Sequence, residues 1–141
     1  MMVGALLGIA GAIYGLLGAL HALYTLLDIR QPRRIVPDDP LVITAMQGSK
    51  IRLTRGESTV WEGWVGFNLS HSLGALMLAA ACFIVAACFR IFAFSPWALF
   101  ALAAVSAVYL LLAVQYWFRI PILGTAIATA CLTGAWLLYL L

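Results

Sequence analysis

Charge is what this sequence has least of. Only 9% of its 141 residues are Asp, Glu, Lys or Arg, and 65% are hydrophobic, whereas a soluble domain has roughly 25% charged and about half apolar residues. Every charged residue lies within 28–62 or at Arg90 or Arg119. Four uncharged runs remain: 1–27, 63–89, 91–118 and 120–141. Since each exceeds the ~20 residues that a helix needs to cross a ~30 Å hydrocarbon core, the sequence predicts an all-α polytopic membrane protein.

Several motifs that carry chemistry are also missing. The chain contains no Walker loop, GxSxG elbow, HExxH or CxxC, and these absences disfavour the enzyme classes that depend on them. No pair of predicted spans carries several acidic residues at mid-depth, which disfavours an ion-coupled transporter or a rotary proton carrier. Cys82, Cys88 and Cys131 all lie inside predicted spans, where we expect them to be small packing residues. We therefore expect no cofactor.

The predicted fold is a single transmembrane domain over residues 1–141. It is an antiparallel bundle of four transmembrane helices with a short amphipathic segment in the first loop, because short connections after Arg90 and Phe118 make neighbouring helices antiparallel. A capping box at Thr59 and Glu62 begins the second span, Ser95 caps the third, and residues 119–121 form a tight connection into the fourth. The spans are expected at about 2–28, 60–89, 96–118 and 121–141, with a loop at 29–59.

The first loop contains signals for two different structures. Asp39 as N-cap with Pro40 at the first helical position predicts a short helix. Its apolar residues would share one face, as in a helix that lies on the membrane surface; they are Leu41, Val42, Ala45 and Met46. A hairpin that turns at Gly48 and Ser49 is the alternative, because residues 50–53 alternate between polar and apolar in the manner of a strand.

The basic residues are concentrated beside one end of the predicted spans. The first loop holds Arg30, Arg33, Arg34, Lys50, Arg52 and Arg55. Arg119 would lie on the same side, whereas Arg90 would lie alone on the other. The positive-inside rule then predicts a cytosolic first loop, with both termini outside, in a cell membrane such as a bacterial inner membrane. This bias also explains the net charge of +3 without a nucleic-acid partner.

Five glycines form a stripe along the first span. Gly4, Gly8, Gly11, Gly15 and Gly18 follow one another at spacings of 4, 3, 4 and 3, which places them on one helical face. Such a smooth face allows close approach of another helix in lipid. We expect packing against the second or fourth span, with a homo-oligomer contact, or a contact inside a larger membrane complex, as the alternative.

Polar residues inside the spans gather near the predicted cytosolic side. His21, Thr25 and Asp28 are spaced 4 and 3, and so are Trp64, Asn68 and His71, so each trio shares one helical face. At 1.5 Å per residue these residues lie within ~17 Å of the cytosolic ends of their helices. On the third span, Tyr109, Gln115 and Tyr116 lie within the same distance of its cytosolic end. Antiparallel packing predicts a polar-floored, aromatic-walled pocket for a membrane lipid or other lipophilic ligand, open toward the inner leaflet.

Other interpretations of these polar residues stay open. They could form a hydrogen-bond network that joins the helices, or His21 poised by Asp28 could act as acid and base opposite His71 in a lipid-modifying or isomerase-like enzyme. The two histidines could also hold a haem or a metal ion. A non-catalytic accessory or scaffold subunit that packs through its glycine stripe is the main alternative to a ligand-binding protein.

Three segments carry a resemblance to a known family. His21 to Asp28 (HALYTLLD), Ala45-Met46 and Gly66 to Gly74 (GFNLSHSLG) resemble a family of small, uncharacterised four-helix bacterial integral membrane proteins. The specificity lies in the Gly-Phe-Asn-x-Ser stretch of the second span, and the resemblance implies the four-span fold without an activity. The layout is also similar to that of sterol-isomerase-like membrane domains, which bind lipophilic ligands, although this similarity is architectural only.

Overall fold

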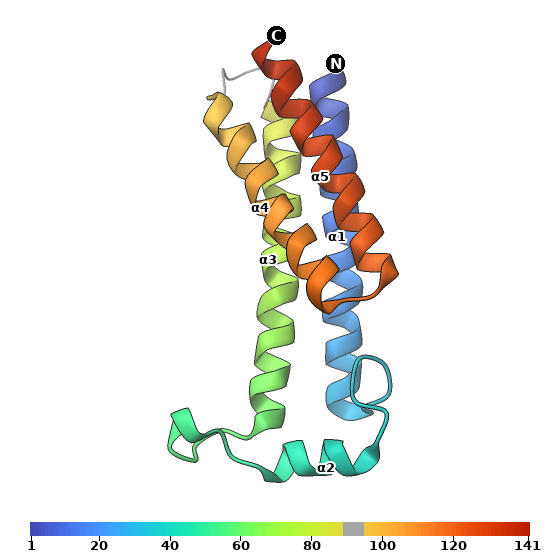
Figure 1. Cartoon of the computed structure of the whole chain (residues 1–141), viewed down its shortest axis with the longest axis vertical. Helices are drawn as coiled ribbons and strands as arrows, with labels where there is room; N and C mark the ends of the chain where they lie inside the picture. The colour runs from blue at the N-terminus through green and yellow to red at the C-terminus, as the bar shows by residue number, and fades with distance from the viewer. Residues whose placement is uncertain (89–94) are drawn as a thin grey trace. The chain divides into compact units, whose positions relative to one another are not determined.

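The computed structural model describes residues 1–88 and 95–141, the side chain of Thr54 excepted. It is 84% helical, and the described residues pair as strands only at an isolated bridge in the first loop. The four long helices are α1 (Met2–Arg30), α3 (Val60–Cys88), α4 (Pro96–Tyr116) and α5 (Arg119–Leu140) (Figure 1). The short helix α2 (Pro40–Gly48) and the 3-10 turn η1 (Arg52–Thr54) lie between α1 and α3. The predicted all-α, four-helix fold is confirmed.

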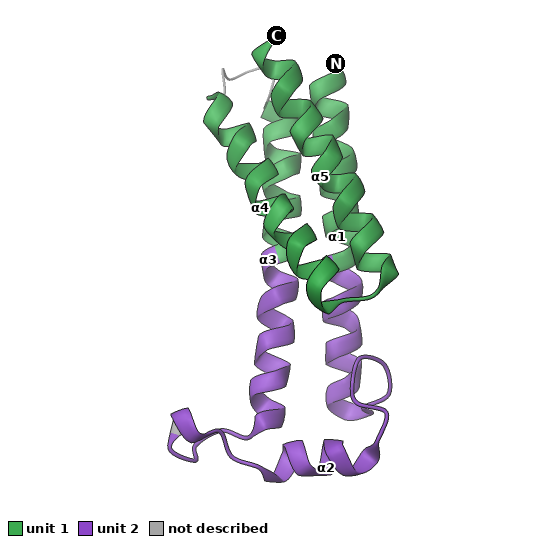
Figure 2. Cartoon of the chain, in the orientation of Figure 1, with its two compact units in different colours: residues 1–17, 75–141 green, residues 18–74 purple. Residues whose placement is uncertain are grey.

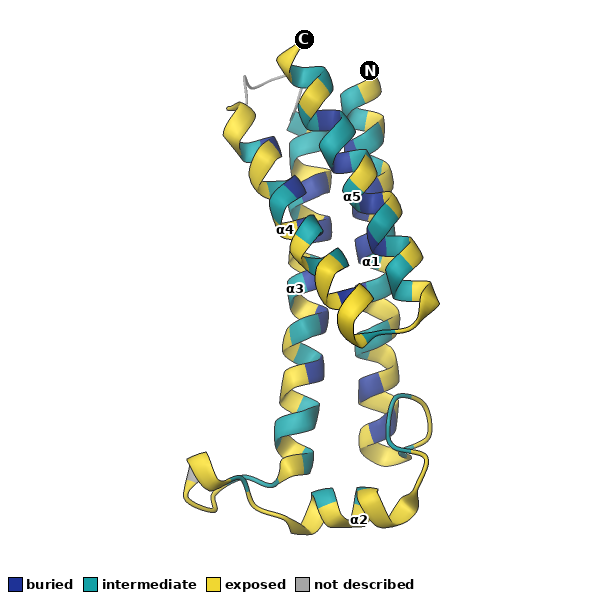
Figure 3. Ribbon diagram, viewed as in Figure 1, coloured by how far each residue is buried: buried dark blue, intermediate teal, exposed yellow. Residues whose placement is uncertain are grey.

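All four long helices are long and apolar enough to cross a membrane. They contain 29, 29, 21 and 22 residues, so at 1.5 Å per residue the shortest reaches about 32 Å and spans a ~30 Å hydrocarbon core. Exposed residues occur along every one of them (Figure 3). Large apolar side chains are among these exposed residues on each helix, for example Leu16, Met77, Leu111 and Leu123. Such surfaces are stable in lipid and aggregate in water. The chain is therefore a multi-pass integral membrane protein.

The helix starts follow from local capping chemistry. Thr59 N–H donates to Glu62 Oε2 over 2.6 Å, and Glu62 N–H donates to Thr59 Oγ1 over 3.1 Å, which is the predicted capping box. Ser95 Oγ accepts from Trp97 N–H at the start of α4. These bonds satisfy amide groups that the first helical turn leaves without an intrahelical partner.

Three helix boundaries differ from the prediction, and one of them is the end of α4, which falls at Tyr116 and not at residue 118. Residues 119–121 were expected as a connection, but α5 begins at Arg119 and the turn consists of Trp117 and Phe118. Pro121 is accommodated in the first turn of α5, because an N–H at that position needs no intrahelical partner. α1 continues to Arg30, just before Gln31-Pro32, where the proline disfavours helical backbone at the preceding residue. Residue 89, the predicted end of the second span, and Arg90 lie outside the described residues.

The first loop forms the predicted helix, and the hairpin alternative is wrong about the turn. Asp39 Oδ1 accepts from Leu41 N–H over 2.8 Å at the start of α2. The chain turns at Arg55 and Gly56, whose φ angles are 52° and 90°, and not at Gly48. Lys50 does pair with Thr59 in an isolated antiparallel bridge. The segment 50–53, which the hairpin alternative predicted as a strand, thus forms only this one bridge before η1 begins at Arg52.

The described chain divides into two compact units (Figure 2). Unit 1 comprises residues 1–17 and 75–141, and unit 2 comprises 18–74. Within unit 1, α4 and α5 lie side by side, and the core consists mainly of alanine and leucine, with Tyr14 and Cys82 also buried. The unit boundaries fall inside α1 and α3 and not at a linker, so the single transmembrane domain stays a prediction.

The glycine stripe packs within the chain. An added Cβ at Gly11 would lie 3.2 Å from Cys82 Cβ and from the Phe83 ring, and one at Gly15 would lie 3.7 Å from Ala79 Cβ. A Cβ added at Gly4 would lie 3.8 Å from the Ala86 carbonyl oxygen. The predicted packing against the second span is therefore confirmed at these three positions. Gly8 has open space around it, Gly18 is buried in unit 2, and the oligomer contact stays a prediction.

Candidate functional site

The two units have interiors of opposite character. All the fully buried hydrophobic side chains of the described chain belong to unit 1. In unit 2, every buried residue other than Gly18 is polar, among the side chains that the structure describes. These residues are Thr25, Asp28, Asn68 and Ser72. Burying polar groups in an apolar helix pair is costly unless they are hydrogen-bonded, so the polar interior of unit 2 is the candidate site. Unit 1 also buries Ser106 and Thr125, but among many hydrophobic residues.

The centre of this site is a hydrogen bond between α1 and α3. His21 Nε2 lies 2.9 Å from Asn68 Oδ1, and Asn68 Nδ2 donates to the Trp64 carbonyl over 2.7 Å. Because a carbonyl only accepts, the second bond fixes the orientation of the amide, and His21 Nε2–H must be the donor in the first. A neutral His21 is then the Nε2–H tautomer. Asn68 thus sets the proton position on a histidine of the neighbouring helix.

Three aromatic rings extend the site from Asn68 to the surface. The His21 and His71 ring centroids are 5.4 Å apart with the planes at 70°, an edge contact. Phe67 stacks on His71 with centroids 6.3 Å apart and an interplanar angle of 15°. Phe67 is 66% exposed, so this row of rings ends at a surface that faces lipid in a membrane. We name His21, Asn68, His71 and Phe67 the imidazole cluster.

Two other predicted site residues, and one residue that was not predicted, support the helices that carry this cluster. Thr25 Oγ1 donates to the His21 carbonyl over 2.9 Å, a bond within α1. Trp64 contributes its carbonyl to Asn68, and its ring stacks on Trp61 with centroids 5.0 Å apart. Ser72, which was not predicted, donates to the Asn68 carbonyl over 2.8 Å. The predicted trios therefore share faces as expected, but their members differ in what they contact.

Asp28 serves the loop and not the imidazole cluster. Its side chain is fully buried, and its oxygens accept from the backbone N–H groups of Arg33, Arg34 and Ile35 at 2.9–3.2 Å. Arg34 Nη1 approaches Oδ1 at 3.5 Å. The expectation that Asp28 poises His21 is therefore wrong. The carboxylate instead offsets its burial by several charge-assisted hydrogen bonds that fold the chain back after α1.

The predicted contributors from the third span belong to unit 1. Tyr109 packs edge-on against Tyr14, with ring centroids 5.5 Å apart, while Gln115 and Tyr116 are exposed. Tyr14 OH lies 2.7 Å from Ser106 Oγ. Ser106 Oγ lies 2.8 Å from Thr129 Oγ1, so three hydroxyls join α1, α4 and α5.

Sequence reasoning missed Tyr14 and Ser106 as members of this chain of three hydroxyls. A signal was present: Tyr14 precedes His21 by seven residues and Ser106 precedes Tyr109 by three, and both spacings keep residues on one helical face. The hydroxyl chain is an interhelical hydrogen-bond network of the kind that joins helices in lipid.

The imidazole cluster does not suit a haem held between two histidines. Such a site needs the porphyrin between the rings, with one nitrogen approaching the iron from each face. His21 and His71 are instead in edge contact, and Nε2 of His21 is bonded to Asn68. In the part of the chain that the structure describes, no three His, Cys, Asp or Glu side chains gather as metal ligands.

Comparisons with protein-family models, with curated proteins and with solved structures found no match to this chain. The resemblance carried by the Gly-Phe-Asn-x-Ser stretch, residues 66–70, therefore stays a prediction.

Proposed function

We propose that this membrane protein binds a neutral lipophilic molecule, a lipid or a smaller hydrophobic compound, at the imidazole cluster. The observation that supports the proposal is the gathering of His21, Asn68 and His71 from two apolar helices. Polar side chains at membrane depth are costly and commonly mark a binding site or an interhelical bond. The cluster ends at the exposed Phe67 ring, which a ligand can contact directly from lipid.

The chemistry of the cluster favours an uncharged ligand with a hydroxyl or carbonyl group. Imidazole and amide groups donate and accept hydrogen bonds, and the neighbouring rings provide flat apolar surface. The cluster itself contains neither an acidic nor a strongly basic side chain, and the carboxylate of Asp28 is engaged by the loop. A charged ligand group would therefore be buried without a counter-ion, which is costly in apolar surroundings.

Mass spectrometry of the organic extract from purified protein tests this proposal. We expect a neutral lipophile enriched over bulk lipid in the native protein and lost from His71→Leu. Ser70→Ala is the matched control, because Ser70 is exposed and bonds only to the Phe67 carbonyl of its own helix. Both variants should keep the native helical content. Identical extracts from all three proteins would overturn the proposal in favour of a purely structural network.

We also propose that the cluster lies in the inner leaflet of a bacterial inner membrane, with both termini outside. The six basic residues of the segment 30–55 support a cytosolic first loop, because Lys and Arg beside spans are retained on the cytosolic side. The proposed role is binding, because the carboxylate expected to poise His21 for acid and base chemistry is bonded to residues 33–35. An accessory role in a larger complex stays a prediction.

A further inference from the structure

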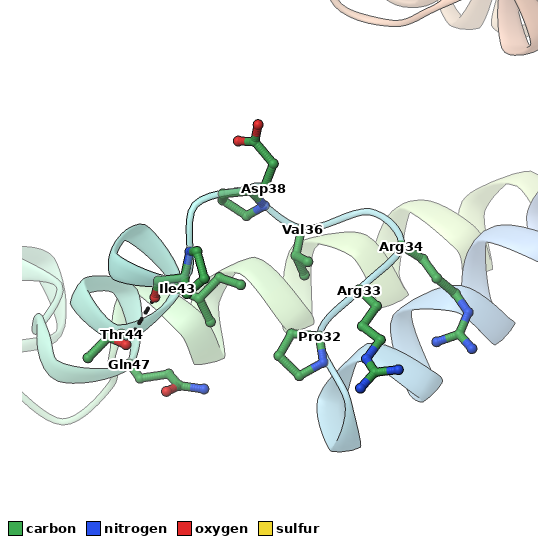
Figure 4. Close-up of a pocket in the computed structure, with 10 residues that line it drawn as sticks. Pro32, Arg33, Arg34, Val36, Asp38, Ile43, Thr44 and Gln47 are labelled. Carbon is green, nitrogen blue, oxygen red and sulfur yellow. Dashed lines mark hydrogen bonds between the residues drawn. The ribbon is translucent and has the colours of Figure 1, made fainter.

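A hollow of about 760 Å³ lies between the segment 32–38 and one face of α2. Figure 4 shows Arg33 and Arg34 on one side of the segment, with the carboxylate of Asp38 pointing away from both. On α2, the hollow is lined by Ile43, Thr44 and Gln47. Thr44 Oγ1 donates to the Pro40 carbonyl, so its oxygen retains capacity to accept, and the Gln47 amide can donate. The lining therefore combines two arginines with neutral polar and apolar residues, and its one acidic residue, Asp38, points its carboxylate away from both arginines.

The buried Asp28 holds the two arginines in place. It binds the backbone N–H groups of Arg33 and Arg34, so the backbone that carries both side chains is fixed from inside unit 2. Asp28 lies 3.5 Å from the Arg34 guanidinium and partly neutralises it, and the Arg34 side chain is 39% exposed. Arg33 is exposed and has no acidic partner among the described residues. Arg33 thus presents its positive charge from a fixed backbone, and the one carboxylate of the lining, that of Asp38, points away from it.

The position of this charge along the chain indicates its ligand. α1 ends at Arg30, three residues before Arg33, so the hollow adjoins the end of a membrane-spanning helix, where phospholipid headgroups flank the hydrocarbon core. Exposed Leu41 and Val42 on α2 suit a helix in the headgroup and acyl-chain boundary. Basic residues next to a span attract anionic lipids, and guanidinium groups bind phosphate by paired, charge-assisted hydrogen bonds. We propose that this hollow binds the phosphate group of an anionic phospholipid.

Lipid titration of the delipidated full-length protein in a neutral detergent tests the proposal. The readouts are the thermal unfolding midpoint, followed by the fluorescence of the five tryptophans, and lipid retention in native mass spectrometry. We expect phosphatidylglycerol to raise the midpoint and to remain bound, and phosphatidylcholine to do so much less. Arg33→Gln should weaken phosphatidylglycerol binding about tenfold, as loss of a charge-assisted hydrogen bond does.

Arg52→Gln is the matched control, because Arg52 is also exposed in the first loop but does not line the hollow. It removes the same charge and should leave the affinity nearly unchanged. Equal weakening by Arg33→Gln and Arg52→Gln would overturn the proposal, since it would show general attraction to a basic loop. Inorganic phosphate that matched phosphatidylglycerol at equal concentration would also overturn it, because the site would then bind a soluble anion.

Discussion

Ser106 is the residue on which the contact of three helices in unit 1 depends. Its hydroxyl lies between Tyr14 OH on α1 and Thr129 Oγ1 on α5, at 2.7 and 2.8 Å. Ser106→Ala removes both interhelical bonds and leaves the buried Tyr14 hydroxyl with a poorer partner. We expect a loss of about 1–2 kcal/mol in the free energy of unfolding, measured by reversible denaturation in mixed micelles.

Ser72→Ala is the control for this prediction. Ser72 is equally buried, but its hydroxyl donates only to the Asn68 carbonyl of its own helix. Its removal should cost less than about 0.5 kcal/mol, because bonds back to the same helix add little to its stability. Equal losses in the two variants would show that the hydroxyl chain does not stabilise the bundle.

Asp28 makes a second prediction at the residue scale. Both carboxylate oxygens accept backbone N–H groups of the segment 33–35, whereas an asparagine would turn its NH₂ group toward one of those donors. Asp28→Asn should therefore lower the free energy of local unfolding of this segment by about 1.5–3 kcal/mol. Trypsin should then cut after Arg33 or Arg34 at least about tenfold faster. Asp38→Asn, at an exposed carboxylate, should leave the cleavage rate unchanged; acceleration in both variants would contradict the role given to Asp28.

At the scale of elements, the contact between α1 and α3 in unit 1 depends on those glycines of α1 that lie against side chains of α3. A Cβ added at Gly11 would lie 3.2 Å from Cys82 and Phe83, while one added at Gly8 would meet no atom within 4 Å. Gly11→Leu should destabilise the protein by about 1–3 kcal/mol, as overpacking does, and Gly8→Leu should be nearly neutral. Thermal unfolding midpoints in detergent compare the two. A larger loss at Gly8 would indicate that this face contacts a second chain, as in the oligomer that the sequence also allowed.

Sequence patterns predicted the helices of this protein better than the contacts between its side chains. Lipid demands long apolar helices, and local capping residues such as Asp39 and Thr59 fix where helices begin, so these features could be predicted from single segments. Spacing also placed His21 and Asn68 on faces that meet. It could not predict the role of Asp28, because a carboxylate at a helix end can bond to its own loop or to a neighbouring helix. Only the path of residues 31–35 decides between them.

At the scale of the whole molecule, the orientation in the membrane can be tested directly. Seven of the eight basic residues lie in the segment 30–55 or at Arg119, which we propose to be on the cytosolic side. With four membrane crossings, both termini are then expected on the outer side. In a variant with Cys82, Cys88 and Cys131 changed to alanine, we expect Leu141→Cys to react with an impermeant maleimide in intact cells. Lys50→Cys should react only after permeabilisation. The positive-inside rule predicts this difference between the two cysteines. Both substituted positions are exposed, so only the bilayer limits access of the maleimide to them. Labelling of Lys50→Cys in intact cells would show that the topology is the reverse of the one proposed. The hollow between the segment 32–38 and α2 would then lie at the outer leaflet.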